Sequence, residues 1–217
     1  MKSQEEQLAE LRQIRSIMER STRFIGLSGF SGVAAGLCAL IGAAILYFYL
    51  NAYPFEGDYS NYLKAVQTGK KWGLSYRTFI FLDGSITAIC AIIFGIFFTM
   101  QKANKKGQSI FNQSALRLLF NLAVPLLTGG IFCFALLYYG LLFLIPATTL
   151  VFYGLALFNG SKFTLHEVQY LGFSEIILGL GALFIVDYSI EIWAIGFGVL
   201  HIVYGALMYY KYEKNNG

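Results

Sequence analysis

Charged residues are scarce in this sequence of 217 residues. Asp, Glu, Lys and Arg together make up 13% of the chain, against roughly a quarter in a typical soluble domain. Hydrophobic residues reach 57% and aromatic residues 17%, with a mean hydropathy of +0.59. This composition excludes an intrinsically disordered chain, which is charge-rich and poor in aromatics. The surplus of only four positive charges also argues against a nucleic-acid-binding protein.

Residues that usually carry metal or redox chemistry are also few, with three cysteines and two histidines. Cys38, Cys90 and Cys133 each lie in a long apolar run without a CxxC neighbour, so we interpret them as small apolar residues. The pair His166-Glu167 has no second histidine nearby, so we expect no metal site. Walker A, HExxH, CxxCH and dinucleotide-binding motifs are missing, and we expect no cofactor.

Long apolar runs dominate what remains. A bilayer-spanning helix needs about 20 largely apolar residues, and the chain offers six such stretches, at 24–47, 78–100, 116–137, 141–158, 169–187 and 190–210. Lipid cannot satisfy backbone polar groups, so segments of this length must be helical. The sequence therefore predicts an all-α polytopic membrane protein with one transmembrane domain over 23–212. The first run is too long for a signal-peptide core, and we expect it to be retained as a span.

Basic residues indicate the orientation of these spans. Of the 16 Lys and Arg residues, 12 lie in the N-terminal segment, the second and fourth connections and the C-terminal segment. The other four lie in the loop between the first two spans, which is rich in Tyr and also contains Trp72. Because cytoplasmic loops carry the excess of Lys and Arg, both termini are predicted to be cytoplasmic.

Residues 1–22 are predicted to form a separate cytoplasmic amphipathic helix. Its apolar residues recur at spacings of three and four among charged ones, over 3–20: Leu8, Leu11, Ile14, Ile17 and Met18. One interpretation is a helix lying on the inner leaflet, with its Arg side chains toward anionic headgroups. The other is a docking helix for a protein partner or for a second copy of the chain.

Small residues form stripes along several of the predicted spans: Ser28, Gly32 and Gly36 in the first, Gly172, Gly179 and Ala182 in the fifth, and Ala194, Gly198 and Gly205 in the sixth. Such stripes let helix backbones approach closely in lipid. They predict a compact bundle and are also candidate surfaces for self-association.

A few polar and ionisable residues fall inside the predicted spans. A charged group at the centre of a span costs about 2.5–3.5 kcal/mol on insertion scales, so such groups usually face the bundle interior. Glu175 and His201 lie on the small-residue faces of two neighbouring spans, and Arg117 and Asn121 share one face of the third. We therefore expect a cytoplasm-facing polar pocket built from Arg117, Asn121, Glu175 and His201. Asp83, near the outer end of the second span, is either turned inward or hydrated at the interface.

This pocket has two interpretations. It is either a hydrogen-bonded knot that fixes helix register, or a site that binds a proton or a small ligand. The second rests on His, which titrates near neutral pH, and on a desolvated Glu, which is able to do the same. Asp83 is a further candidate for proton or ligand binding.

The expected function is therefore that of an integral membrane protein without a catalytic motif, such as a transporter-like protein, a sensor or a subunit of a membrane complex. One alternative is an intramembrane serine hydrolase, because Ser28 and Ser31 each lie in a GxSG pattern like that of rhomboid-type proteases, with His201 as the base. The other is a purely structural membrane subunit.

Four stretches, 16–33, 120–132, 170–180 and 191–205, resemble an uncharacterised family of six-span integral membrane proteins from Bacteroidota. The resemblance implies the cytoplasmic (inner) membrane of a Gram-negative bacterium. It implies no activity, no cofactor and no functional residues.

Overall fold

The computed structural model describes residues 24, 27–57, 70–105 and 113–214. The amphipathic helix expected over 1–22 lies outside these residues. The described chain forms the α-helices α2 (Gly29–Leu50), α4 (Tyr76–Lys105), α5 (Gln113–Tyr138), α6 (Ile145–Gly160), α7 (His166–Phe184), α8 (Ser189–Trp193) and α9 (His201–Tyr212). Short 3-10 turns η1 (Leu142–Leu144), η2 (Ser161–Phe163) and η3 (Val186–Tyr188) adjoin them, and a π-helical segment, η4 (Ala194–Leu200), joins α8 to α9. Strands β1 (Lys70–Lys71) and β2 (Leu74–Ser75) pair antiparallel.

Six of these helical segments are long and apolar enough to cross a membrane: Gly29–Leu50, Tyr76–Lys105, Gln113–Tyr138, Leu142–Phe163, His166–Phe184 and Val186–Tyr212. The predicted number of apolar helices and their order along the chain are confirmed.

Several predicted boundaries differ from the structure by a few residues. The first helix begins at Gly29 rather than at residue 24. Phe24 lies outside the helix and bonds to the η2 turn and the residue after it: its N–H donates to the Phe163 carbonyl (2.7 Å) and its carbonyl accepts from Thr164 Oγ1 (2.8 Å). The second helix runs on to Lys105, past the expected end at residue 100. Its last turn holds Lys102 and Lys105, and cations are favourable at a helix C-terminus.

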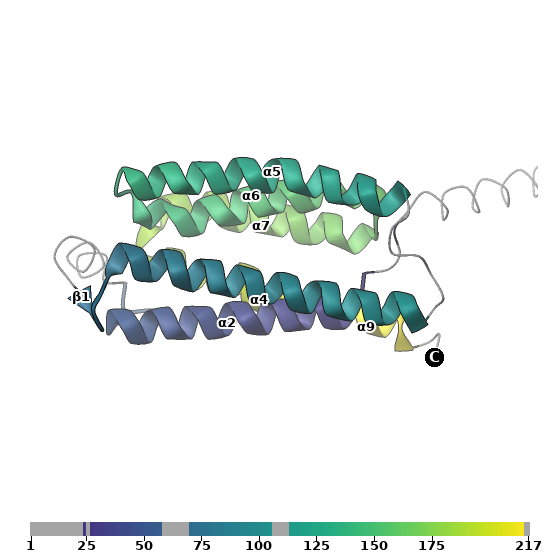
Figure 1. The fold of residues 1–217 in the computed structure, drawn as a ribbon, viewed down its shortest axis with the longest axis horizontal. Helices are drawn as coiled ribbons and strands as arrows, with labels where there is room; N and C mark the ends of the chain where they lie inside the picture. Colours follow the sequence, from purple (N-terminus) through teal and green to yellow (C-terminus); the bar gives the residue numbers. More distant parts are fainter. Residues whose placement is uncertain (1–23, 25–26, 58–69, 106–112, 215–217) are drawn as a thin grey trace, which may run out of the picture.

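The helices form two layers (Figure 1). In one layer α6 lies between α5 and α7 and packs on both, and in the other α2 lies between α4 and the last helical segment. Contacts of α7 with α8, η4 and α9, and of α6 with α8, join the layers. Because α4 packs mainly on α2 and α5 mainly on α6, these two helices are the most exposed of the bundle.

Glycines set the closest helix contacts. A Cβ added at Gly36 of α2 would lie 2.6 Å from the Gly198 carbonyl oxygen, and one at Gly205 of α9 would lie 2.6 Å from the Gly29 oxygen. In the other layer, a Cβ at Gly154 of α6 would lie 2.6 Å from the Gly172 oxygen. The small-residue stripes therefore lie where helices of this chain meet, and the absence of a side chain lets the backbones touch.

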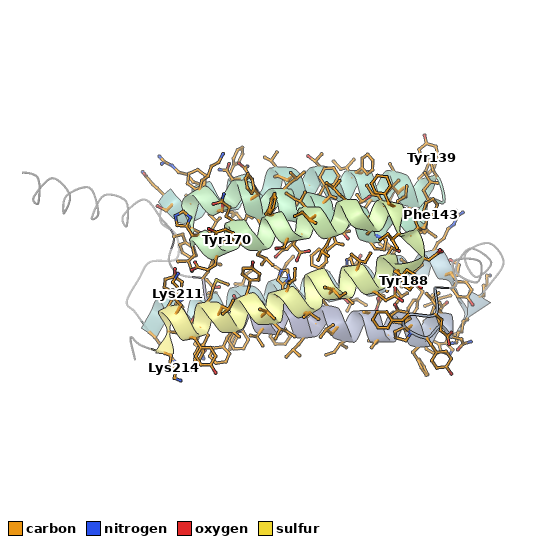
Figure 2. All side chains as sticks on the ribbon, turned by 180° about the vertical axis from the view of Figure 1, so that it is seen from behind. Tyr139, Phe143, Tyr170, Tyr188, Lys211 and Lys214 are labelled. Atoms are coloured by element: carbon orange, nitrogen blue, oxygen red, sulfur yellow. The ribbon has the colours of Figure 1, made fainter. Side chains whose placement is uncertain are left out.

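The two ends of the bundle differ in chemistry. Figure 2 shows Tyr139, Phe143 and Tyr188 at one end, and Lys211 and Lys214 at the other. The first is called here the aromatic end; it also holds the β1–β2 hairpin, where the Tyr49 hydroxyl donates to the carbonyls of Lys71 and Leu74 (3.0 and 2.9 Å). The second is called the basic end; there Glu213, just after α9, accepts a hydrogen bond from the Gly29 N–H (2.7 Å) and so caps α2.

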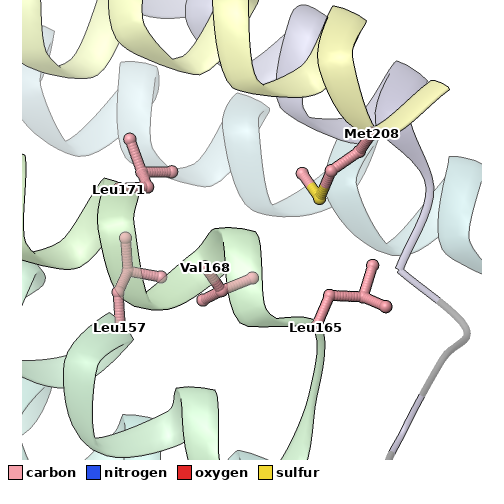
Figure 3. Close-up of a cluster of buried hydrophobic side chains, with 5 residues drawn as sticks. All are labelled: Leu157, Leu165, Val168, Leu171 and Met208. Atoms are coloured by element: carbon pink, nitrogen blue, oxygen red, sulfur yellow. The ribbon is translucent and has the colours of Figure 1, made fainter. Parts of the chain in front are cut away.

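An apolar cluster joins the two layers near the basic end. It consists of Leu157, Leu165, Val168, Leu171 and Met208, all buried. Figure 3 shows Met208 reaching from α9 toward the four others, which come from α6, α7 and the turn before α7. The cluster therefore fills the space that separates the two layers, from the basic end as far as the middle of the bundle.

Candidate functional site

Glu175 and His201 come together in the middle of the bundle. Glu175 lies nine residues after the start of α7, about 14 Å along the helix at 1.5 Å per residue. His201 lies eleven residues before the end of α9, about 16 Å from that end. Their side chains are 0% and 5% exposed, and His201 Nδ1 lies 3.4 Å from Glu175 Oε1. Glu175 lies deeper than the predicted span would place it, because α7 begins at His166 rather than at residue 169.

The ring of His201 is held by hydrogen bonds at both nitrogens. Nδ1 lies 3.1 Å from the Gly196 carbonyl oxygen, and Nε2 lies 2.8 Å from the Tyr153 hydroxyl. Since a carbonyl only accepts, Nδ1 carries a hydrogen. In the neutral ring Nε2 is then the acceptor, and the Tyr153 O–H donates to it. Helix α6 thus contributes Tyr153 to a three-residue cluster, which we call the Glu–His–Tyr cluster.

Glu175 itself is poorly satisfied. Neither carboxylate oxygen has a hydrogen-bond partner among the residues that the structure describes, although the side chain is fully buried. Buried polar side chains nearly always have partners, and an exception calls for an explanation. His201 Nδ1 lies 3.4 Å from Glu175 Oε1 but is closer to the Gly196 carbonyl oxygen, at 3.1 Å.

Aromatic rings surround His201, two of them from the same helical segment and one from α6. Trp193, Phe197 and His201 follow each other at four-residue spacing, with ring centroids 5.1 Å apart for the first pair and 5.9 Å for the second. Tyr153 lies 4.9 Å from Phe197 and 5.3 Å from His201, and the Trp193 Nε1–H donates to Thr149 Oγ1 (3.1 Å). These contacts fix the ring plane of His201 in front of Glu175.

The π-helical segment places Gly196 directly against the carboxylate. A Cβ at Gly196 would lie 2.5 Å from Glu175 Oε2 and 2.5 Å from Leu150 Cδ2. Only glycine therefore fits beside Glu175 without a shift. π-Helical turns are rare and occur frequently at functional sites, and here the segment supplies both this close approach and the carbonyl that holds His201.

Two of the four residues expected in the pocket lie elsewhere. Arg117 is exposed on α5, and Asn121 pairs instead with Asn159 of α6, whose Nδ2 donates to Asn121 Oδ1 (3.0 Å). The expected four-residue pocket is therefore wrong in this respect. Arg117 and Asn121 lie one turn apart on α5, but α6 lies between α5 and α7, so α5 does not bring them to Glu175.

The expected opening toward the basic end also differs from the structure. The apolar cluster of Figure 3 lies between the Glu–His–Tyr cluster and that end, because Leu157, Leu171 and Met208 come one to two turns nearer to it along α6, α7 and α9. Toward the aromatic end, Ala147 and Leu150 of α6 and Ala182 of α7 are almost fully buried. The cluster is therefore enclosed on both sides.

Asp83 lies apart from this site. It is on α4, one turn before Thr87, which packs against Gly42 of α2. Its side chain is partly exposed. The structure thus places Asp83 beside the α2–α4 contact and in the half of α4 near the aromatic end.

The serines considered for a hydrolase do not meet His201. Ser28 Oγ is 3.5 Å from Glu213 Oε2, and Ser31 Oγ donates to the Ser28 carbonyl (2.5 Å). Both lie at the basic end, whereas His201 bonds to Tyr153 and Gly196. Within the described ranges, no three His, Cys, Asp or Glu side chains are grouped so that they could hold a metal ion.

Tyr153 and Gly196 were not predicted as site residues. Tyr153 is one of 15 tyrosines and Gly196 one of 23 glycines, and the sequence around each resembles that of an ordinary packed span. A π-helical turn has no sequence signature of its own, so its contribution emerges only from the three-dimensional arrangement.

Comparisons of this chain with protein-family models, curated proteins and solved structures gave no match. The assignment of function therefore rests on the six apolar helices and on the geometry of the Glu–His–Tyr cluster.

Proposed function

We propose that the chain is a multi-pass protein of a bacterial cytoplasmic membrane that binds a ligand at the Glu–His–Tyr cluster and acts as a transporter-like protein or a sensor rather than as an enzyme. Six apolar helices of sufficient length support a membrane location. The basic end carries Lys102, Arg117 and Lys211, which favours placing it and both termini in the cytoplasm. The sequence resemblance to inner-membrane proteins supports the same location.

The observation that carries the proposal is the unsatisfied Glu175. A buried carboxyl group without hydrogen bonds costs about 1–3 kcal/mol or more relative to a satisfied one. Two other carboxylates, the buried Glu191 and the partly buried Glu213, are satisfied: Glu191 accepts from the Phe55 N–H (2.9 Å) and Glu213 from the Gly29 N–H (2.7 Å). Ionisable residues inside membrane spans are costly and usually functional. A role in binding explains why such a group is kept at the centre of the bundle.

The enclosure of the site fits this class of function. The apolar cluster lies on one side, and closely packed alanine and leucine side chains lie on the other. A ligand from either side reaches Glu175 only when the two layers separate locally. Such a site at mid-height between helices is typical of transporters that open to one side at a time, and a sensor would use the same movement to report binding.

The replacement Glu175→Gln tests whether the cluster is a binding site or a structural knot. If Glu175 serves binding, an uncharged isostere removes an unsatisfied acid, and thermal unfolding in detergent is expected at the same or a higher temperature than in the wild-type protein. Functional sites are often less than optimal for stability. The measurement is the unfolding temperature of the purified full chain.

Glu213→Gln is the matched control, because Glu213 has well-formed contacts, including Lys102 Nζ at 3.2 Å. Its replacement is expected to lower the free energy of unfolding by about 1–3 kcal/mol. Each kcal/mol lost lowers the unfolding temperature by about 2–4 °C in a protein of this size. If Glu175→Gln lowers the unfolding temperature as much as Glu213→Gln does, the cluster is a structural knot and the proposed binding function is wrong.

A further inference from the structure

We infer that the ligand of the Glu–His–Tyr cluster is a proton, which Glu175 and His201 hold as a pair and whose release is transmitted to the π-helical segment η4. This inference rests on the proposed function, in which the cluster is the binding site.

Space around the carboxylate favours a proton over a larger ligand. Gly196 and Leu150 close in on Oε2, where even a methyl group on Gly196 would overlap both. On the other side the rings of Tyr153, Phe197 and His201 contact one another. A proton is the one ligand that binds a carboxylate without displacing any of these groups.

The charged groups around the Glu175 carboxylate also favour a proton as its ligand. Of the elements packed on α7, α6 brings Tyr153 to the site and α9 brings His201. The α8 carboxylate, Glu191, is engaged by the Phe55 N–H near the aromatic end, and Lys211 of α9 pairs with Glu167 at the basic end. Among the described residues, His201 is thus the one basic side chain within ion-pair distance of Glu175.

The pair of Glu175 and His201 has no net charge when it holds one proton more than a carboxylate and a neutral imidazole hold together. This proton is held as a carboxylic acid beside a neutral imidazole, because neither buried group is then charged. The neutral ring also keeps its Nδ1–H on the Gly196 carbonyl and its Nε2 as the acceptor of the Tyr153 hydroxyl. When this proton leaves for water, one uncompensated negative charge remains on the buried carboxylate. The one-proton state is therefore the stable state of the enclosed site, and loss of the proton destabilises it.

The protonation state of Glu175 is coupled to η4 through the Nδ1–H of His201. Two acceptors compete for it, the Gly196 carbonyl at 3.1 Å and Glu175 Oε1 at 3.4 Å. A carboxylate is the stronger acceptor of the two because hydrogen bonds to ionised groups are stronger. Ionisation of Glu175 therefore draws Nδ1–H away from Gly196, and the freed carbonyl lets η4 change its hydrogen-bond register.

Two measurements on the purified full chain in detergent test this inference. The first is infrared difference spectroscopy between acidic and alkaline pH, in which a protonated carboxylic acid has its own carbonyl band. We expect one such band to disappear at high pH in the wild-type protein and to be lost in Glu175→Gln. It is expected to persist in Glu191→Gln, the matched carboxylate control.

The second measurement follows η4 directly. The chain has two tryptophans, Trp72 and Trp193, so Trp72→Phe leaves Trp193, next to η4, as the only reporter. Its fluorescence is expected to change with pH in a single-proton transition at the same pH as the infrared band. Glu175→Gln and His201→Gln should each remove this transition, and His166→Gln, at the only other histidine, should keep it.

The outcomes separate the two proposals. If the carboxylic acid band is missing at every pH, or persists in Glu175→Gln, or if Trp193 does not respond, the proton inference is overturned. The binding function then still stands when Glu175→Gln is as stable as the wild-type protein. A marked loss of stability in Glu175→Gln, equal to that in Glu213→Gln, overturns the binding function instead.

Discussion

The environment of a glutamate decides what it does in this chain. Glu213 caps the first turn of α2 and pairs with Lys102, and an acidic group is favourable at a helix N-terminus. Glu167 pairs with Lys211 and accepts from the Tyr212 hydroxyl (3.0 Å). Glu175 is buried, and neither of its carboxylate oxygens has a hydrogen-bond partner in the described part of the chain. The first two glutamates stabilise the bundle, and the third is the group on which the proposed binding function depends.

Tyr153→Phe is expected to destabilise the protein and to loosen His201. The replacement removes the hydroxyl that lies 2.8 Å from Nε2 and leaves a buried ring nitrogen without its partner, at a cost of about 1–3 kcal/mol. Thermal unfolding in detergent measures the loss. Tyr170→Phe is the control, since Tyr170 is 64% exposed, and an equal loss in both variants would contradict the role given to Tyr153.

Of the residues that form the site, the pairing of Glu175 with His201 was predictable from the sequence. Glu175 and His201 are on the small-residue faces of helices that are neighbours along the chain, and their pairing followed from this and from similar depth. Arg117 was wrongly included because the spacing of residues along a helix defines a face but not the helix that this face meets. Tyr153 was missed because a single tyrosine in an apolar span carries no pattern.

Among the elements, the packing of helices depends on where glycine is placed. Gly36 of α2 touches the backbone of η4. Gly95 of α4, in contrast, has no described atom within 4 Å of the position of a Cβ, apart from its chain neighbours and the backbone of its own helix. The same residue type therefore serves a close contact in one helix and lies in open surroundings in another.

This contrast predicts opposite effects of one substitution. Gly36→Ala is expected to destabilise the bundle by about 1–3 kcal/mol, because the added methyl group forces α2 and η4 apart. Gly95→Ala is expected to stabilise it by up to about 1 kcal/mol, the difference in helix propensity. Unfolding temperatures in detergent decide the matter, and effects of the same sign at both positions would contradict the described packing.

Helix number and order were predictable from the sequence because length and hydropathy alone determine them. Helix ends were less predictable. Helix α2 begins later than expected because Phe24 bonds to the η2 turn and Glu213 caps Gly29. Both partners are distant in sequence from α2, so the local sequence gives no sign of them. The π-helical turn of η4 was not predictable, since its residues have the composition of an ordinary span.

At the scale of the whole molecule, the difference between its ends bears on orientation. Among the described residues, the basic end carries Lys and Arg at the ends of four of the six apolar helical segments, at Lys102, Lys105, Arg117, Lys162, Lys211 and Lys214. The aromatic end gathers Tyr and Trp side chains, a composition typical of a membrane interface. Because cytoplasmic loops carry the excess of Lys and Arg, it is the basic end that favours one orientation over its reverse.

This orientation predicts the outcome of reporter fusions in a bacterial host. A reporter that is active only in the cytoplasm should be active at both termini and in the connection between α4 and α5. A reporter that is active only outside should be active in the connection between α2 and α4. Fusions that indicate an odd number of crossings would contradict the six-span arrangement, and an inverted pattern would contradict the orientation alone.

The contact between α2 and α9 has a consequence for biogenesis. Gly29 and Gly36 of α2 meet Gly205 of α9 and Gly198 of η4, so the ribosome makes one side of this interface more than 140 residues before the other. Until η4 and α9 have been made, α2 has α4 beside it but lacks its other neighbour. This layer of the bundle therefore closes late, and a chain that stops before residue 201 leaves α2 half-assembled and open to quality-control proteases.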